Sequence, residues 1–115
     1  MKTERQRYIL FKIIREPEIR FERNEIIDSI WRSIWRYFGM KVANKVGLWI
    51  IELNFEKNYG IIRFSHQTKE IIISALSLVT QINGKRVILS PLKTSGTIRS
   101  IIRITHLIMN KQKSI

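Results

Sequence analysis

The sequence predicts an α+β fold, with a four-stranded antiparallel sheet in β-α-β-β-α-β order and an added C-terminal helix. Stretches of β-branched and aromatic residues alternate with period two, apolar residues recur elsewhere at helical spacing, and turn residues separate these stretches. The chain has 115 residues, 44% of them hydrophobic, and contains no repeat or Pro/Gly-rich linker. We therefore expect one domain over residues 1–115.

The first expected elements are a strand and a helix. Residues 8–14 are rich in β-formers, and Pro17 follows them closely enough to end the strand. Over residues 24–38, isoleucines and aromatic residues fall at i, i+3 and i+4 spacing, which is typical of an amphipathic helix. Gly39 is expected to end this helix, because glycine readily adopts the left-handed conformation common at helix C-termini.

A hairpin and a second helix are expected next. Residues 46–55 and 59–66 have the composition of strands, and Glu56-Lys57-Asn58 between them has the composition of a turn. Thr68 can cap a helix that runs to about residue 82, and Asn83-Gly84 after it is a strong turn signal.

The last expected elements are a short strand over residues 87–89, limited by Pro91, and a helix over residues 96–109. Residues 110–115 are expected to form a frayed basic tail. The first six elements then follow the split β-α-β order of ferredoxin-like and RNA-recognition domains.

Alternation along the strands predicts which side chains share a sheet face. The residues expected to face the first two helices are Ile9, Phe11, Ile13, Ile62 and Phe64. The opposite face is expected to carry Tyr8, Leu10, Lys12, Leu48, Ile50, Ile61 and Arg63. That face is too apolar to remain bare, so the last helix or a protein partner should cover part of it. The residues expected at a partner interface are Tyr8, Leu10 and Ile50, with Ile73 and Leu76 of the second helix.

The charge indicates an anionic partner. Lys and Arg total 21 against 9 acidic residues, a formal net charge of +12, which favours nucleic acid as the partner class. A membrane surface is the competing partner, but no apolar run approaches the roughly 20 residues that span a bilayer. The absence of cysteine and of a secretory signal core fits a cytoplasmic protein.

The residues that carry catalysis in other proteins do not cluster here. His66 and His106 lack ligand spacing, the carboxylates form no group suited to a metal-dependent nuclease, and no nucleophile motif is present. We therefore expect no catalytic site, metal or cofactor on the protein. The expected third strand also holds Ile61 and Arg63 where an RNA-recognition motif places its stacking rings.

A candidate phosphate contact lies at the start of the last helix. Lys93-Thr94-Ser95-Gly96-Thr97-Ile98-Arg99 combines small residues with two cations, and helix N-termini favour anions. The alternative is an ordinary N-cap made by Ser95 and Thr97. Arg99 begins a polar stripe that continues through Arg103, and Arg5 and Arg7 lie in a basic arm before the first strand.

Four segments carry a resemblance to a known family. They are Arg7-Tyr8-Ile9-Leu10-Phe11, Ile27-Asp28-Ser29-Ile30-Trp31 with Phe38-Gly39, Gly47-Leu48-Trp49 with Tyr59-Gly60-Ile61-Ile62-Arg63, and Ser95-Gly96-Thr97-Ile98-Arg99. On these segments the chain resembles the ribonuclease P protein component 2 family. The lack of a long acidic C-terminal tail is more similar to its archaeal members.

The resemblance implies a function and a set of partners. It implies a non-catalytic subunit that binds and stabilises the catalytic RNA of ribonuclease P and supports removal of the 5′ leader from precursor tRNA, the RNA using Mg²⁺. The implied partners are that RNA, precursor tRNA, ribonuclease P protein component 3 and other ribonuclease P proteins, in a homodimer or a two-plus-two heterotetramer. The RNA contacts carried over by matching positions are Ser95, Gly96, Thr97 and Arg99, followed by Arg7, Asn58 and Arg63.

Two other functions stay open at this point. One is a basic, sequence-independent nucleic-acid-binding protein, and the other is a ferredoxin-like regulatory domain that binds a small anion. Competition between structured RNA and duplex DNA separates the first from a ribonuclease P subunit, and stabilisation by a metabolite would favour the second.

Overall fold

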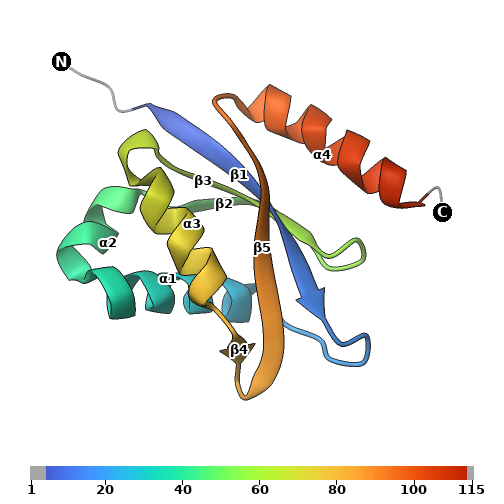
Figure 1. Cartoon of the computed structure of the whole chain (residues 1–115), viewed down its shortest axis with the longest axis horizontal. Coiled ribbons are helices and arrows are strands. Elements are labelled where there is room, and N and C mark those ends of the chain that lie inside the picture. The colour runs from blue at the N-terminus through green and yellow to red at the C-terminus, as the bar shows by residue number, and fades with distance from the viewer. Residues whose placement is uncertain (1–4, 114–115) are drawn as a thin grey trace.

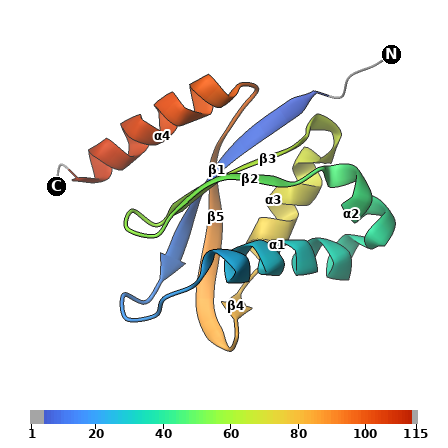
Figure 2. The same cartoon turned by 180° about the vertical axis from the view of Figure 1, so that it is seen from behind.

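An antiparallel sheet separates three helices from a fourth in the computed structural model, which describes residues 5–113 (Figures 1 and 2). The strands are β1 (Gln6–Arg15), β2 (Trp49–Asn54), β3 (Tyr59–Ser65), β4 (Gln81–Ile82) and β5 (Lys85–Ser95). The helices are α1 (Arg23–Phe38), α2 (Met40–Val46), α3 (Lys69–Leu78) and α4 (Ile98–Lys113), with a 3-10 turn η1 (His66–Thr68) before α3. The strand order is β2-β3-β1-β5-β4, and each neighbouring pair is antiparallel.

The sheet has five strands in the described residues, so the prediction of four is wrong. The extra strand β4 folds back on β5 through Asn83-Gly84, whose φ angles of 53° and 79° are both positive. A two-residue turn with two positive φ angles matches the twist of a hairpin, which explains why this sequence was a strong turn signal. Helix α3 consequently ends at Leu78 and not near residue 82.

Helix α2 and the register of β2 differ from the sequence-based expectation. Gly47, in the left-handed conformation, ends α2, and β2 begins only at Trp49. Trp49 then lies opposite Arg63 and Ile50 opposite Ile62, so the alternation of this segment differs by one residue from the expected one, and Leu48 also belongs to the larger core. Because a one-residue shift exchanges the two faces of a strand, Ile50 packs against the larger core and not on the opposite face.

Strand β5 is longer than expected because Pro91 lies at an irregularity. Phe11 of β1 pairs with Pro91, and the preceding residue Leu10 pairs with Lys93, so Leu92 is the additional residue of a bulge. Proline lacks an N–H donor and is tolerated at bulges, where the hydrogen-bond ladder is already interrupted. The strand therefore continues through Pro91 to Ser95.

Two hydrophobic cores lie on opposite faces of the sheet. The larger core, between the sheet and α1–α3, contains the predicted inward residues Ile9, Phe11, Ile13, Ile62 and Phe64, which confirms that part of the alternation. The smaller core, beneath α4, has as its buried residues Leu10, Tyr59, Ile61, Ile101 and Met109. The expectation that the last helix covers part of the opposite face is confirmed.

The burial of two residues corrects the expected partner interface. Leu10 and Leu76 are fully buried inside the protein, one in each core, so their side chains cannot contact a partner in this conformation. Ile73 packs against the larger core and Tyr8 against the smaller one, each with part of its side chain accessible.

Helix α4 runs to Lys113, beyond its expected end at residue 109. Residues 114–115 of the expected tail lie outside the described residues. Among the described helices, none combines the length and apolar character needed to cross a membrane.

Candidate nucleic-acid interface

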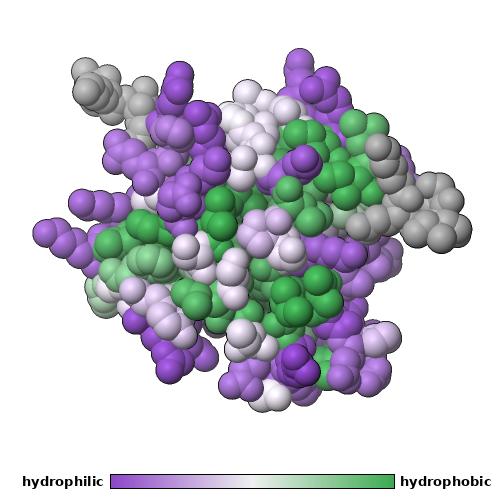
Figure 3. Space-filling model, viewed as in Figure 1, coloured by the Kyte–Doolittle hydropathy of each residue, from purple (hydrophilic) through white to green (hydrophobic). Residues whose placement is uncertain are grey.

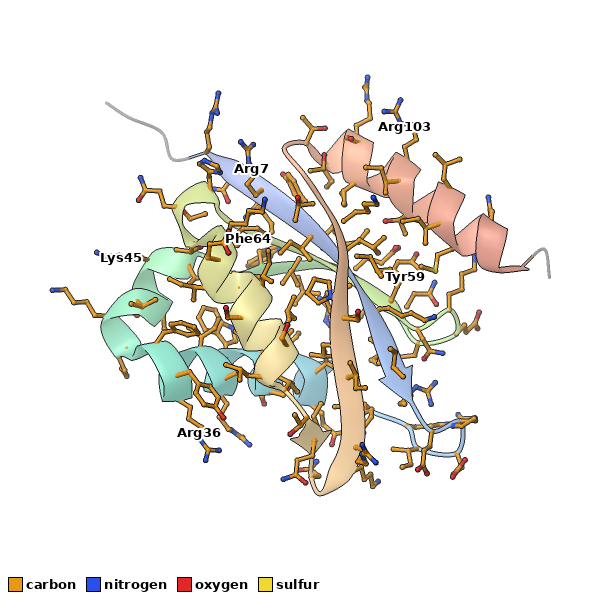
Figure 4. The ribbon with its side chains drawn as sticks, viewed as in Figure 1. Arg7, Arg36, Lys45, Tyr59, Phe64 and Arg103 are labelled. Atoms are coloured by element: carbon orange, nitrogen blue, oxygen red, sulfur yellow. The ribbon has the colours of Figure 1, made fainter. Side chains whose placement is uncertain are left out.

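Three distant parts of the chain meet beside the start of α4. Arg7 Nε of β1 donates a hydrogen bond to His66 Nδ1 of η1, at 3.1 Å. A Cβ atom added to Gly96 would lie 2.7 Å from Arg7 Nη1, so the guanidinium occupies the space that any larger residue would fill. We call these three residues the Arg7 corner; Figure 4 shows Arg7 at the N-terminal end of β1.

The backbone holds the Arg7 corner in register. Tyr8 lies opposite Ser95 in the ladder between β1 and β5, which brings Gly96 beside Arg7. The His66 N–H donates to the carbonyl oxygen of Arg5 at 2.8 Å, which ties the end of β3 to the start of β1. Two strand pairings therefore hold Arg7 within β1. The prediction that Arg7 lies in a basic arm before the first strand is wrong.

The hydrogen bond between Arg7 and His66 uses one donor of the guanidinium. An arginine Nε can only donate, so His66 Nδ1 is the acceptor. The Nη donors of Arg7 remain for an anion.

The hydroxyl groups at the start of α4 accept hydrogen bonds from the backbone. Thr97 Oγ1 accepts the Ser100 N–H at 3.2 Å, and Ser95 Oγ accepts the Thr97 N–H at 3.3 Å. Thr97 is therefore the N-cap residue of α4, whereas Ser95 closes a turn just before the helix. The cations of the segment project beside this capped helix start.

Three cations lie exposed on or next to α4. Lys93 is near the end of β5, Arg99 is in the first turn of α4, and Arg103 is one turn further along the same helix. Figure 4 shows Arg103 on α4. Together with the Arg7 corner and the exposed Arg5, they surround the start of α4 and the adjoining ends of β1 and β5 with positive charge.

Two predicted RNA contacts lie away from this surface. Asn58 is at the far end of β1, where its Oδ1 accepts from Arg15 Nε at 2.9 Å and its carbonyl accepts the Ile13 N–H at 2.8 Å. This places Asn58 in a structural turn, where its φ is 56°. Arg63 lies on the sheet face, with its guanidinium carbon 6.0 Å from the centre of the Trp49 ring.

Sequence reasoning missed His66 and Trp49 as candidate functional residues. His66 and Arg7 are 59 positions apart in the sequence, so no local motif could predict their contact. Trp49 is 60% exposed, and the alternation of β2 could have indicated this if its register had been assigned correctly.

A tyrosine–carboxylate pair lies at the smaller core. Tyr59 O–H donates to the Glu52 carboxylate, with distances of 2.8 and 3.0 Å to its two oxygens. Burial, and then the Glu52 carboxylate, raise the pKa of Tyr59 above 10.0. Within residues 5–113, no three His, Cys, Asp or Glu side chains are grouped as metal ligands.

Comparison with known proteins gives consistent matches. Residues 7–105 match the sequence model of the Rpp14/Pop5 family. Ribonuclease P protein component 2 of Pyrococcus furiosus is 35% identical over 100 residues, which cover 87% of this chain and 82% of the relative. The protein of the same name from Methanosarcina barkeri is 30% identical over 95 residues, covering 83% and 67%. A chain in the cryo-EM structure of yeast ribonuclease MRP has a TM-score of 0.69 at 15% identity, with full coverage of both chains, so that likeness concerns the fold.

Proposed function

The chain belongs to the Rpp14/Pop5 family, and from this membership we propose that it is a non-catalytic protein subunit of ribonuclease P. It binds and stabilises the catalytic RNA and supports removal of the 5′ leader from precursor tRNA. The observation that carries the proposal is the identity of about one third to proteins named ribonuclease P protein component 2, over more than four fifths of this chain. Enzyme activity then belongs to the holoenzyme, in which the RNA uses Mg²⁺.

The basic surface supports the RNA-binding part of this proposal. The net charge of +12 favours a polyanion, and cations lie around the start of α4 at Arg7, Lys93, Arg99 and Arg103. Contacts of this kind hold an RNA backbone in position and do not read its sequence. Ser95, Gly96 and Thr97 contribute indirectly, by capping α4 and by leaving room for the Arg7 guanidinium.

Protein partners fit another part of the surface. Apolar areas remain exposed between charged side chains (Figure 3), and the junction of α1 and α2 exposes Trp35 by 51%, Tyr37 by 50% and Met40 by 67%. Large aromatic residues of this kind supply much of the energy of protein interfaces. We place ribonuclease P protein component 3 or another subunit here, in a two-plus-two assembly or beside a second copy of this chain.

The fold type and the cellular location are also part of the proposal. The β1-α1-β2-β3-α3-β5 order, with β1 and β3 central, supports a ferredoxin-like core to which β4 and α4 are added. A subunit that acts on precursor tRNA works in the cytoplasm, which agrees with the absence of cysteine.

Reconstitution of leader cleavage tests the function. Catalytic RNA, component 3 and precursor tRNA are combined with and without this chain, and cleavage is measured at limiting Mg²⁺. We expect the chain to raise the cleavage rate and to prefer the catalytic RNA over duplex DNA at matched salt. Equal cleavage with and without the chain, at protein concentrations that saturate the RNA, would refute the proposal.

A matched pair of variants tests the contact surface. Arg99→Ala should weaken RNA binding and lower the slope of log affinity against log salt by about one, because one phosphate contact is lost. Arg20→Ala removes the same charge from an exposed position in the loop after β1 and should leave the slope nearly unchanged. If the two variants changed RNA affinity and the salt slope equally, RNA binding would depend on net charge and not on a contact at Arg99.

A further inference from the structure

Four residues, one from each of four strands, form one row across the sheet face that carries α4. Trp49 of β2 lies opposite Arg63 of β3, Arg63 lies opposite Tyr8 of β1, and Tyr8 lies opposite Ser95 of β5. Directly opposite residues project from the same face, and Tyr8 packs against the smaller core beneath α4. With neighbouring strands about 4.8 Å apart, the row from Trp49 to Ser95 is about 14 Å long.

The aromatic ring at the outer end of this row is not used by either core. Trp49 is 60% exposed and belongs to neither hydrophobic cluster, whereas Trp31 of α1 packs against the larger core. Helix α4 packs on β1 and β5, at the other end of the row. The row is therefore covered near Ser95 and open at Trp49.

The Arg63 guanidinium in the row is not paired with a carboxylate of residues 5–113. In the described part of the chain, Arg63 Nε is buried and makes no hydrogen bond. Glu52, opposite Ile61 in the neighbouring row, instead accepts the hydrogen bond of Tyr59. A partly buried guanidinium without a counter-charge favours an anionic ligand, and an exposed tryptophan beside it favours a flat aromatic one.

We propose that Trp49, Arg63 and Tyr8 form a platform on which an unpaired base of the RNA stacks, a proposal that rests on the function given above. RNA satisfies both requirements, since it combines a phosphate charge with bases that stack on aromatic rings and guanidinium planes. The Arg7 corner does not extend this row, because Arg7 lies opposite Phe64 of the larger core and so projects from the other face of the sheet. A single strand with a phosphate beside Arg63 can place a neighbouring base on Trp49, at the open end of the row.

This arrangement differs from the RNA-recognition motif that the sequence was compared with. The expected ring positions of the third strand hold Ile61 and Arg63, and the rings are supplied by the strands on either side of Arg63. Stacking would therefore take place at the two flanks of a cation, on β2 and β1.

The test compares two exposed tryptophans. Trp49→Ala, Trp49→Phe and Trp35→Ala are measured for binding to a single-stranded ribo-oligonucleotide, to an RNA duplex of the same sequence and to the catalytic RNA. Loss of one stacked base should weaken single-strand binding about tenfold in Trp49→Ala. Trp49→Phe should restore most of the affinity. Trp35→Ala, which alters only the proposed protein-partner surface on α1, should bind these RNAs as the wild type does when no partner protein is present. The salt slope should be unchanged in all three variants, because no phosphate contact is removed.

Two outcomes would overturn the platform. One is single-strand binding by Trp49→Ala that equals the wild type, with thermal unfolding showing an intact fold. The other is a loss of component 3 binding by Trp49→Ala with RNA affinity unchanged, which would make the row a protein interface. Wild-type protein that fails the reconstitution assay while Trp49→Ala still weakens single-strand binding would refute the ribonuclease P role and leave the platform standing.

Discussion

Adding one methyl group at Gly96 should displace the Arg7 guanidinium without removing its charge. The new Cβ of Gly96→Ala would lie 2.7 Å from Arg7 Nη1, whereas unstrained contacts between non-bonded heavy atoms begin near about 3.5 Å. The atom that must move is the far end of a flexible side chain, so the backbone can stay in place. Gly96 also has no positive φ, and alanine fits its conformation.

The required shift sets the size of the effect. Nη1 must move by about 0.8 Å, the difference between these two distances. A hydrogen bond of about 2.9 Å from Nη1 to an RNA phosphate oxygen would then be stretched beyond its useful range. A hydrogen bond to a charged group contributes about 1.5–3 kcal/mol, and 1.4 kcal/mol corresponds to tenfold in affinity. We expect Gly96→Ala to weaken binding to the catalytic RNA about tenfold. Its salt slope should stay close to that of the wild type, since the charge is retained.

Equilibrium binding at several salt concentrations checks this prediction. Arg7→Ala should lower both the affinity and the slope, and Gly96→Ala added to Arg7→Ala should cause no further loss, because the group it displaces is already gone. Thermal unfolding should show Gly96→Ala at least as stable as the wild type, since alanine restricts the unfolded chain. Wild-type affinity in Gly96→Ala, combined with weak binding by Arg7→Ala, would show that RNA does not use Arg7 in the observed position.

Three further changes test the fold around the site. Gly60→Ala should lower the free energy of unfolding by about 1–3 kcal/mol in urea titrations, because its Cβ would meet the Phe11 ring and lie 2.7 Å from Leu53 Cδ2. Tyr59→Phe should cost about 1 kcal/mol at pH 7 through the bond to Glu52. The raised pKa of Tyr59 means that the folded state holds its proton more tightly, so this advantage is present below pH 10 and disappears as the pH rises through the folded-state pKa; an unchanged difference at pH 11 would contradict this. Thr97→Ala should lower stability by about 1 kcal/mol through loss of the cap and leave RNA affinity unchanged well below the melting temperature, whereas a lost RNA contact would appear as weaker binding.

Elements with strong local patterns were predicted well from the sequence. Helix α1 begins and ends within one residue of the expected bounds, since its apolar spacing extends over four turns and Gly39 ends it. The alternation of β1 correctly placed Ile9, Phe11 and Ile13 in the larger core. In both cases the spacing of residues within a single segment is enough to make the prediction.

Elements decided by contacts between segments were not predicted. Helix α2 has only seven residues, too few for a clear period, and its best signal was Gly47 at its end. The face of Ile50 depends on which residue of β3 it pairs with, and Pro91 is tolerated only because β1 leaves an irregularity beside it. For the same reason, Arg99 could be found within its own motif, whereas His66 could not.

The unequal cores on the two faces of the sheet determine how the molecule opens. β1 is shared by both cores, but α4 is held mainly by the smaller one, through Ile101 and Met109. Opening free energy scales with the apolar area exposed, so α4 can detach as a unit while the larger core persists. Amide hydrogens of α4 should then exchange before those of α1. The arginines on this helix are therefore carried by an element that opens before the larger core, and RNA bound across α4 and β1 would close that opening.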